Sequence, residues 1–327
     1  MFFSIIIPLF NKEDYVLRAV MSVLEQSYDS FEVIIVDDGS TDGSLMKISD
    51  IQDPRVHIVE TDNNGVSVAR NIAIGKSHGD YLVFLDADDT FDVDYLRTIH
   101  DGIVDYSFPE MIVSGVSIIS EDNLVIVPRK VGVYNSTSFR EVFFDDEVNN
   151  HGLPGYIAGK AVSNSFIKEN GICFNPQLSL AEDLDFWLQC YRKASSIVSI
   201  DYSGYNYYVG LEGSSVFQTG IDYISQLNIW SKIYSYVIPK DDKAKQVFNQ
   251  KFTGYALSAF NEMREVRYKE VKRLLKEIKH HKSEIRYELV SNGKMLCPLV
   301  RIGFAPFIYL YLKIREIYHD KRNCSCL

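Results

Sequence analysis

Residues 81–89 read YLVFLDADD, a short apolar run that ends in a cluster of carboxylates. Two similar segments precede it, FSIIIPLFN at residues 3–11 and FEVIIVDDGS at residues 31–40. Apolar runs of this length are typical of strands buried on both faces of a sheet. Stretches with helical spacing of apolar residues, such as Leu17–Leu24 and Val66–Ile74, separate these runs. The alternation predicts an α/β domain with a mostly parallel sheet and helices on both faces.

Polar residues follow each predicted strand at its carboxyl end. Pro8 to Glu13 follow the first strand, Asp37 and Asp38 the second, and Asp86 to Asp89 the strand that begins at Tyr81. Parallel sheets of this kind bind ligands at the carboxyl ends of their strands, near the point where the strand order reverses. We therefore expect these groups to share one cleft.

The pair Asp86 and Asp88, one residue apart, has the chemistry of a site for Mg²⁺ or Mn²⁺. Such ions accept few protein carboxylates and fill their other positions with water and phosphate oxygens. A solvated turn is the better explanation of an isolated Asp-x-Asp, but the position at the end of an apolar strand favours the metal. Asp88 is the better ligand candidate, with Asp86 beside it.

Two further clusters lie near this edge. Asp37 and Asp38 can accept hydrogen bonds from a base or a ribose, while the Ser-Thr-Asp run at 40–42 predicts a helix start near Thr41. Arg70 lies in NNGVSVARN, at residues 63–71, together with Asn64 and Gly65. An arginine suits a phosphate, but a structural salt bridge with one of the clustered aspartates is equally compatible with this position.

Glu182 and Asp183 open a predicted helix at Ala181–Arg192. A carboxylate there can accept a proton from an attacking hydroxyl group if it projects into the cleft. Capping of the helix N-terminus is the alternative explanation.

Taken in this order, SIIIPLFNKEDYV, FEVIIVDDGSTDGS, NNGVSVARNIAIGKSHGDYLVFLDADD and AEDLDFW resemble the motifs of family 2 glycosyltransferases. The resemblance runs through about residues 1–215. It implies an inverting, metal-dependent hexosyltransferase with a GT-A fold. Such an enzyme moves a sugar from a UDP-sugar to a hydroxyl group of a glycan, glycoprotein or lipid-linked acceptor, in surface polysaccharide or glycoprotein glycan assembly.

The resemblance also implies roles for individual residues. The donor-binding set comprises Pro8, Phe10, Asn11, Glu13, Asp37, Asp38, Asn64, Gly65, Arg70, Asp86, Ala87 and Asp88. Within it, Asp38 binds the uracil, Arg70 lies near the diphosphate or supports the aspartates, and Asp86 and Asp88 contact the sugar, the ribose and the metal. Asp183 is the general base, and Glu182 positions the acceptor.

One departure from the family pattern concerns the diphosphate. Many relatives carry a basic residue after the aromatic stretch at 205–208, where this chain has Val209. Lys160, Lys168 and Arg192 are the replacements that we consider.

The bulk properties limit the partners. The net charge of −10 argues against nucleic acid, whose phosphates require a basic surface. Five scattered cysteines show no zinc or disulfide spacing and favour a cytoplasmic protein. The first residues are read as a strand rather than as a signal peptide.

The predicted organisation is a catalytic domain at 1–220, with a donor half at about 1–105 and an acceptor half at about 106–220, followed by a helical C-terminal region at 221–327. A polar loop near 145–155 is a candidate lid. From Arg264 to Arg322 there are 15 basic and 7 acidic residues. The apolar and basic segment 295–318 suits contact with anionic lipid on the cytoplasmic face, or packing on protein, and the region offers a surface for homo-oligomers.

Two other functions fit parts of the sequence. A nucleotidyltransferase on a similar sheet would usually begin with a Gly-rich, basic loop, which PLFNKED is not. A non-catalytic nucleotide-sugar-binding or scaffold protein would not need Asp86, Asp88, Glu182 and Asp183 together.

Overall fold

The chain divides into two compact units, Met1–Gln218 and Thr219–Leu327. The computed structural model describes residues 1–121, 123–129, 131–138, 157–178 and 181–211 of the first unit. In the second it describes 252–253, 256–257, 268–277, 305–306, 308–310 and 312, with helix α11 at Tyr268–Glu277. The loop at 145–155 and most of the segment 295–318 therefore lie outside the described residues. Within the described part, no helix has the length and apolar character needed to cross a membrane.

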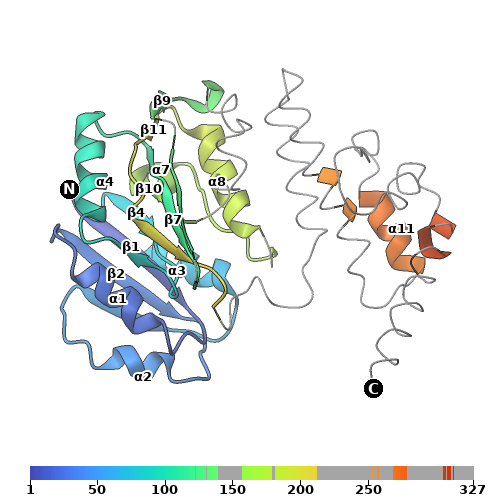
Figure 1. Cartoon of the computed structure of the whole chain (residues 1–327), viewed down its shortest axis with the longest axis horizontal. Helices are drawn as coiled ribbons and strands as arrows, with labels where there is room; N and C mark the ends of the chain where they lie inside the picture. The colour runs from blue at the N-terminus through green and yellow to red at the C-terminus, as the bar shows by residue number, and fades with distance from the viewer. Residues whose placement is uncertain are drawn as a thin grey trace. The chain divides into compact units, whose positions relative to one another are not determined.

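An eight-stranded sheet forms the centre of the first unit, in the order β3-β2-β1-β4-β10-β6-β11-β9 (Figure 1). Its strands are β1 (Phe3–Leu9), β2 (Phe31–Asp37), β3 (Val56–Glu60), β4 (Tyr81–Phe84), β6 (Met111–Val113), β9 (Gly132–Tyr134), β10 (Lys160–Ser163) and β11 (Ile197–Ser199). Strands β1 to β4 run parallel to their neighbours among these four, whereas β10 is antiparallel to both β4 and β6. The chain adds β2 on one side of β1 and β4 on the other, so the order reverses beside β1.

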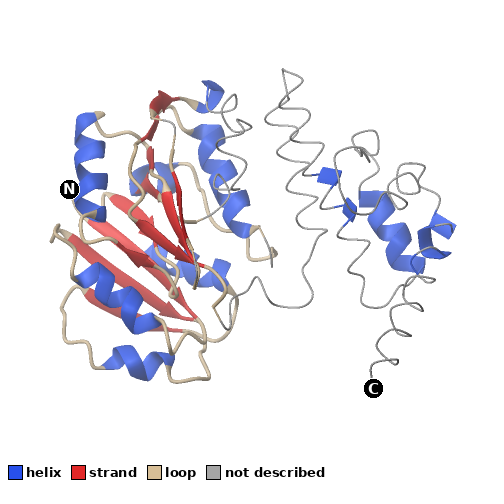
Figure 2. Ribbon diagram, in the orientation of Figure 1, coloured by secondary structure: helices blue, strands red, loops and turns tan. Residues whose placement is uncertain are grey.

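Helices cover both faces of this sheet, as Figure 2 shows. They are α1 (Val16–Leu24), α2 (Ser44–Ser49), α3 (Val66–Lys76), α4 (Tyr95–Asp105), α7 (Asn164–Glu169) and α8 (Glu182–Lys193). On one face, alternate residues of β1 such as Ile5 and Ile7 pack in one core with Val20 of α1 and Ile99 of α4. On the other face, α3 packs against β1 and β2, and the Phe84 ring contacts the rings of Phe186 and Trp187. The prediction of an α/β domain with a mostly parallel sheet is confirmed.

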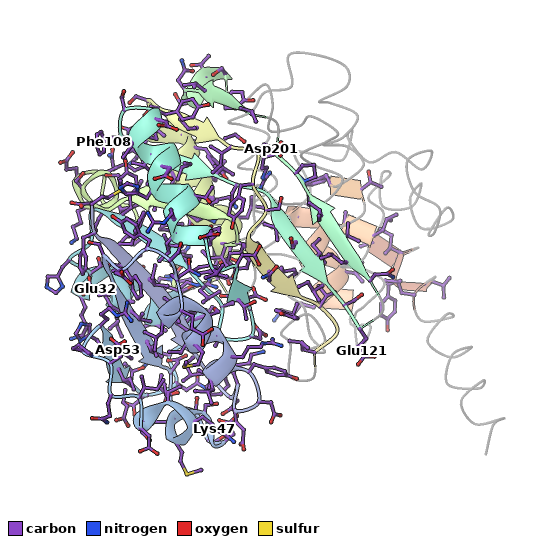
Figure 3. All side chains as sticks on the ribbon, turned by 60° about the vertical axis from the view of Figure 1, so that its left-hand side comes forward. Glu32, Lys47, Asp53, Phe108, Glu121 and Asp201 are labelled. Carbon is purple, nitrogen blue, oxygen red and sulfur yellow. The ribbon has the colours of Figure 1, made fainter. Side chains whose placement is uncertain are left out.

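A smaller sheet of four strands has the order β5-β12-β7-β8. Its strands are β5 (Thr90–Phe91), β7 (Val116–Ile119), β8 (Leu124–Val127) and β12 (Tyr205–Tyr208). Strands β7 and β8 form an antiparallel hairpin, with Glu121 at its tip in Figure 3. Strand β12 pairs with β5, and β5 begins directly after the carboxylates at 86–89. The aromatic stretch 205–208 therefore lies next to these carboxylates.

The sequence predicts one strand at Met111–Ser120, but the structure divides it between the two sheets. Strand β6 belongs to the large sheet and β7 to the small one, with Ser114 and Gly115 between them. A Cβ atom at Gly115 would lie 2.2 Å from the Ser203 hydroxyl oxygen and 2.6 Å from the Val127 carbonyl oxygen. Only glycine fits this close approach, which is what lets the chain pass from one sheet to the other.

Candidate active site

The carboxyl ends of β1, β2 and β4 carry the residues that the sequence singles out. The loop after β1 and the loop after β2 are joined by direct hydrogen bonds. The Asn11 side-chain oxygen accepts from the Thr41 backbone N–H at 2.8 Å, and the Glu13 carboxylate accepts from the Gly43 N–H at 2.8 Å. In return, Ser40 and Ser44 hydroxyl oxygens accept from the N–H groups of Asn11 and Lys12. These contacts keep residues 40–43 out of the helix, so α2 begins at Ser44 rather than at Thr41.

Asp38 is buried and holds the turn that precedes α3. Its two carboxylate oxygens accept from the backbone N–H groups of Asn64, at 2.9 Å, and Gly65, at 2.8 Å. Gly65 has a φ of 92°, a backbone conformation that residues with a Cβ rarely adopt. Asp38 thereby fixes the turn beside the loop after β1, where Phe10 is 40% exposed. This edge of the sheet therefore presents the partly exposed Phe10 ring next to the fixed main chain of the turn at residues 64–65.

Arg70 of α3 joins two parts of the site that are distant in sequence. Its Nη2 lies 2.9 Å from Asp86 Oδ1, while its Nη1 lies 2.5 Å from Asp183 Oδ1 and 3.3 Å from Glu182 Oε1. The guanidinium is only 3% exposed. Burial by itself lowers the pKa of Arg70, but the attraction of the three carboxylates outweighs this effect. The net result is a pKa above the usual arginine value, so the side chain stays charged. Of the two roles considered for Arg70, the salt bridge is the one present in the structure.

Glu182 and Asp183 sit in the first turn of α8, after Ala181 in the left-handed conformation with a φ of 63°. Burial raises the pKa of Asp183 to about 8, and the negative charges of Glu182 and Asp86 add to this, against the opposing effect of Arg70. A carboxyl group with such a pKa is matched to proton transfer near neutral pH. Its side chain remains 20% exposed, which leaves it accessible to a reacting hydroxyl group.

Two cations that the sequence analysis did not single out flank Asp88. Lys12 Nζ lies 2.6 Å from Asp88 Oδ2, and the Arg18 guanidinium donates to the Asp88 carbonyl oxygen at 2.8 Å. The same guanidinium stacks 3.9 Å from the Tyr208 ring. Arg18 therefore stands beside Val209, the position at which the family pattern predicts a basic residue.

Of the replacements considered for that residue, two have other roles. Lys168 donates to the Ser77 carbonyl oxygen, and Lys160 is buried on β10. The sequence does contain a signal for Lys12, since it lies between the selected residues Asn11 and Glu13. Arg18 carried no such signal, because its role depends on how α1 is placed against β12.

Asp89 anchors the second sheet to the predicted metal motif. Its carboxylate accepts from the Tyr205 hydroxyl at 2.8 Å and from the Tyr208 backbone N–H at 2.9 Å. Burial raises the pKa of Asp89 well above its usual range, and the charges of Asp86 and Asp88 raise it further. Burial also raises the pKa of Asp86, partly offset by Arg70. The Ala87 side chain between them is buried in the core, so only its main chain can face a ligand.

This donor set fits a hard divalent cation. Asp86 and Asp88 supply oxygen atoms, and the raised pKa values of Asp86 and Asp89 reflect both burial and an excess of negative charge that such a cation would offset. Among the described residues, no group of three or more His, Cys, Asp or Glu side chains gathers around one metal position. A metal here would therefore take two protein carboxylates at most and complete its coordination with phosphate and water oxygens.

Comparison with known proteins finds a matching family model and several relatives. The sequence model described as "Glycosyl transferase family 2" matches residues 4–156. The chain is 31% identical over 193 residues to TuaG of Bacillus subtilis, a glycosyltransferase named for teichuronic acid biosynthesis, covering 58% of this chain and 72% of TuaG. It is 36% identical over 105 residues to the glycosyltransferase GlyA of Streptococcus pneumoniae, covering 32% of this chain and 15% of GlyA.

The fold is shared with a solved structure. TarS 1–349 of Staphylococcus aureus, crystallised with UDP-GlcNAc, superimposes with a TM-score of 0.67 at 19% identity, over 98% of this chain and 92% of that chain. In sequence, the poly(ribitol-phosphate) β-N-acetylglucosaminyltransferase TarS is 25% identical over 222 residues, covering 64% of this chain and 36% of TarS. The GT-A fold that the sequence motifs imply is confirmed by this likeness.

Proposed function

Because this chain belongs to glycosyl transferase family 2, we propose that it transfers a sugar from a UDP-sugar to a hydroxyl group of a glycan acceptor, with inversion at the anomeric carbon. One observation carries the proposal. Through Arg70, a single buried guanidinium joins Asp86 of the predicted metal motif to Asp183, the predicted base. An enzyme that must activate a donor and an acceptor across one reacting bond needs these two groups held in fixed relation.

The loops after β1 and β2 are the proposed nucleotide pocket. Asp38 and the ordered turn at 64–65 face the base and ribose, and Phe10 supplies an exposed ring. Pro8, Asn11, Glu13 and Asp37 shape the same edge. The fold neighbour's crystals contain UDP-GlcNAc, which supports a UDP-sugar as the donor class for this chain.

Lys12 and Arg18 are the proposed contacts of the donor diphosphate. They bring two positive charges to the side of Asp88, next to Tyr208. Diphosphate oxygens are strong acceptors for such groups, and the leaving UDP carries more negative charge than the bound donor. The two side chains thereby supply the charge that Val209 cannot.

On the acceptor side, Asp183 takes the proton of the attacking hydroxyl group, and Glu182 orients the acceptor. The hydroxyl oxygen attacks the anomeric carbon from the face opposite UDP, so the configuration inverts in one displacement without a covalent enzyme intermediate. A positioned base of this type contributes on the order of 10²–10⁴-fold. Arg70 holds the Asp183 carboxylate in place and stabilises its charged form.

Asp88, with Asp86, would hold Mn²⁺ or Mg²⁺ against the donor diphosphate. When bound, such an ion offsets the charge that develops on the leaving group. Within the protein, Asp86 is oriented by Arg70, and Asp88 by Lys12 and by the Arg18 contact to its carbonyl oxygen.

TuaG is named for teichuronic acid biosynthesis and TarS for the transfer of N-acetylglucosamine to poly(ribitol phosphate), which supports a polymeric acceptor for this chain. A glycoprotein or lipid-linked acceptor is a prediction from the sequence. A location on the cytoplasmic face of a membrane, contact through 295–318 and self-association through the C-terminal region remain predictions from the sequence.

A donor screen with the full-length protein tests the proposal. Release of UDP from UDP-hexoses and UDP-N-acetylhexosamines is followed with and without Mn²⁺, before and after addition of an acceptor panel. We expect one donor class to be turned over and to depend on a divalent cation. Turnover of no UDP-sugar, or release of pyrophosphate from a nucleoside triphosphate instead, would reject a glycosyl transfer function.

A further inference from the structure

One face of α8 carries Asp183, Trp187 and Tyr191 at successive turns. Residues four apart on a helix lie above one another, about 6 Å apart along its axis. The rings of Trp187 and Tyr191 are both fully buried, with centroids 6.5 Å apart, whereas Asp183 at the start of the row is partly exposed. The row therefore leads from the proposed base into the acceptor half of the domain.

Two basic side chains lie against this row. Lys160, the first residue of β10, places its Nζ 5.2 Å from the centre of the Trp187 ring. Arg129, which follows β8, donates from Nε to the Ser114 carbonyl oxygen at 3.2 Å. The Ser114 N–H in turn donates to the carbonyl oxygen of Gly159, the residue before Lys160. The strand ends thus bring both cations to the same part of the helix face.

Both basic groups are placed where charge is costly. Arg129 is 8% exposed and Lys160 is 1% exposed. Burial lowers the pKa of Lys160 and the neighbouring charge of Arg129 lowers it further, while burial lowers the pKa of Arg129 to about 10. Asp183 also acts on Lys160, in the opposite direction, which links the cations to the proposed base.

Two buried donors at this place have no acceptor within the part of the chain that the structure describes. They are Nη2 of Arg129 and the indole Nε1 of Trp187. Buried polar groups are nearly always hydrogen-bonded, so such atoms call for an explanation. Donors from an arginine and an indole beside the buried Lys160 amino group have the chemistry of a site for an anion, whose charge would favour the protonated lysine.

We propose that Arg129, Lys160 and Trp187 form a subsite for a phosphate or carboxylate group that the acceptor carries next to its reacting hydroxyl group. This inference rests on the proposed function, since it takes Asp183 as the base that binds the hydroxyl group. With the hydroxyl at Asp183, the anionic group lies one to two helical turns along α8. A planar guanidinium can bind either type of anion with two parallel hydrogen bonds, so the shared chemistry covers both.

The subsite is distinct from the one proposed for the donor diphosphate. Lys12 and Arg18 gather at Asp88 and Tyr208, on the side of α1 and β12. Arg129 and Lys160 lie on the side of α8, beyond Asp183. Anion selectivity in the acceptor half would thus be independent of donor binding.

Acceptor kinetics provide the first test. Arg129→Gln and Trp187→Phe each remove one of the two donors, and the second keeps an aromatic ring in the core. We expect the KM for an anionic acceptor to rise about 10- to 100-fold in Arg129→Gln and less in Trp187→Phe. The affinity for UDP and the slow hydrolysis of the donor should not change. Arg55→Gln is the control. It removes an arginine that pairs with Asp53 just before β3, the strand at one edge of the large sheet.

A binding assay identifies the anion. The chain has two tryptophans, so in a Trp230→Phe background Trp187 emission reports the subsite alone. We expect a saturable change with ribitol 5-phosphate or with glucuronate, and none with ribitol or glucose. A response to one anion and not the other assigns the class. Equal responses to charged and neutral ligands, or an Arg129→Gln protein with unchanged response and unchanged KM, would overturn the subsite. If the unmodified protein does not hydrolyse any UDP-sugar donor, the proposed function itself is rejected.

Discussion

Arg70 Nη1 lies 2.5 Å from Asp183 Oδ1, although 113 residues separate the two in the chain. The pair connects α3, which packs on the parallel part of the sheet, with the first turn of α8. Through its other amino group the same arginine also holds Asp86 at the end of β4. One buried side chain therefore fixes the predicted donor motif relative to the proposed base, so we expect the site to be sensitive to substitution of Arg70.

Arg70→Met should destabilise the first unit by about 3–5 kcal/mol, because it leaves three carboxylates without the cation they share. Arg70→Lys keeps a charge but cannot span Asp86 and Asp183 together, so we expect an intermediate loss of stability and a large loss of turnover. Denaturant unfolding and donor turnover measure the two effects. Arg55→Gln, at a partly exposed pair, should change stability by only about 1 kcal/mol. Equal stability of Arg70→Met and the unmodified protein would contradict the structural role.

Asp183→Asn should abolish transfer and leave UDP-sugar binding largely intact. The amide occupies the same volume and can still contact Arg70, but it cannot accept the proton of the acceptor hydroxyl group. Calorimetric titration with UDP and a transfer assay separate binding from chemistry. Normal turnover in this variant would remove Asp183 from the role of base.

Part of this site could be read from the sequence because the relevant groups follow buried strands. Strands β1, β2 and β4 form within the predicted segments at residues 3–11, 31–40 and 81–89, since these segments are mainly apolar before their carboxylates. Parallel strands then place Asp38 and Asp86 at one edge by topology alone. These predictions depend only on local pattern.

Other features depend on tertiary contacts that local pattern does not encode. Arg70 could be placed near the carboxylates, but the choice between a phosphate and a salt bridge depended on where α8 packs. The position of Arg18 in the site could not be predicted, because it depends on the packing of α1 against Tyr208 of β12. The bend at Gly115 depends on Ser203, which is distant in sequence. Each of these is a long-range contact whose partner a linear pattern does not identify.

The rate of transfer should depend on pH through Asp183. Burial first, and the charges of Glu182 and Asp86 next, raise the pKa of its carboxyl group to about 8. A base must be ionised, so kcat/KM for the acceptor should rise roughly tenfold per pH unit and level off above about pH 8. Glu182→Gln removes a negative neighbour, which should lower the pKa of Asp183 and move the profile to lower pH. A profile that is flat from about pH 6 to about pH 9 would contradict this assignment.

The Lys12 and Arg18 side chains should contribute to the binding of UDP but not of uridine, because only the diphosphate carries the charge they recognise. Lys12→Met should weaken UDP binding about tenfold, whereas Arg18→Gln, at an exposed position, should have a smaller effect of about threefold. Lys12→Arg should retain part of the affinity. Titration calorimetry with both ligands, at low and high salt, measures these differences.

Lys47→Met provides the matched control, since Lys47 is an exposed lysine on α2 that Figure 3 shows at the outer surface of the domain. It removes the same charge from the same unit and should leave both affinities unchanged. The two variants therefore separate a local contact from the general effect of net charge, which is already −10. If Lys12→Met and Lys47→Met weaken UDP binding equally, or if Lys12→Met weakens uridine as much as UDP, then Lys12 acts through the Asp88 loop or through the overall field rather than on the diphosphate.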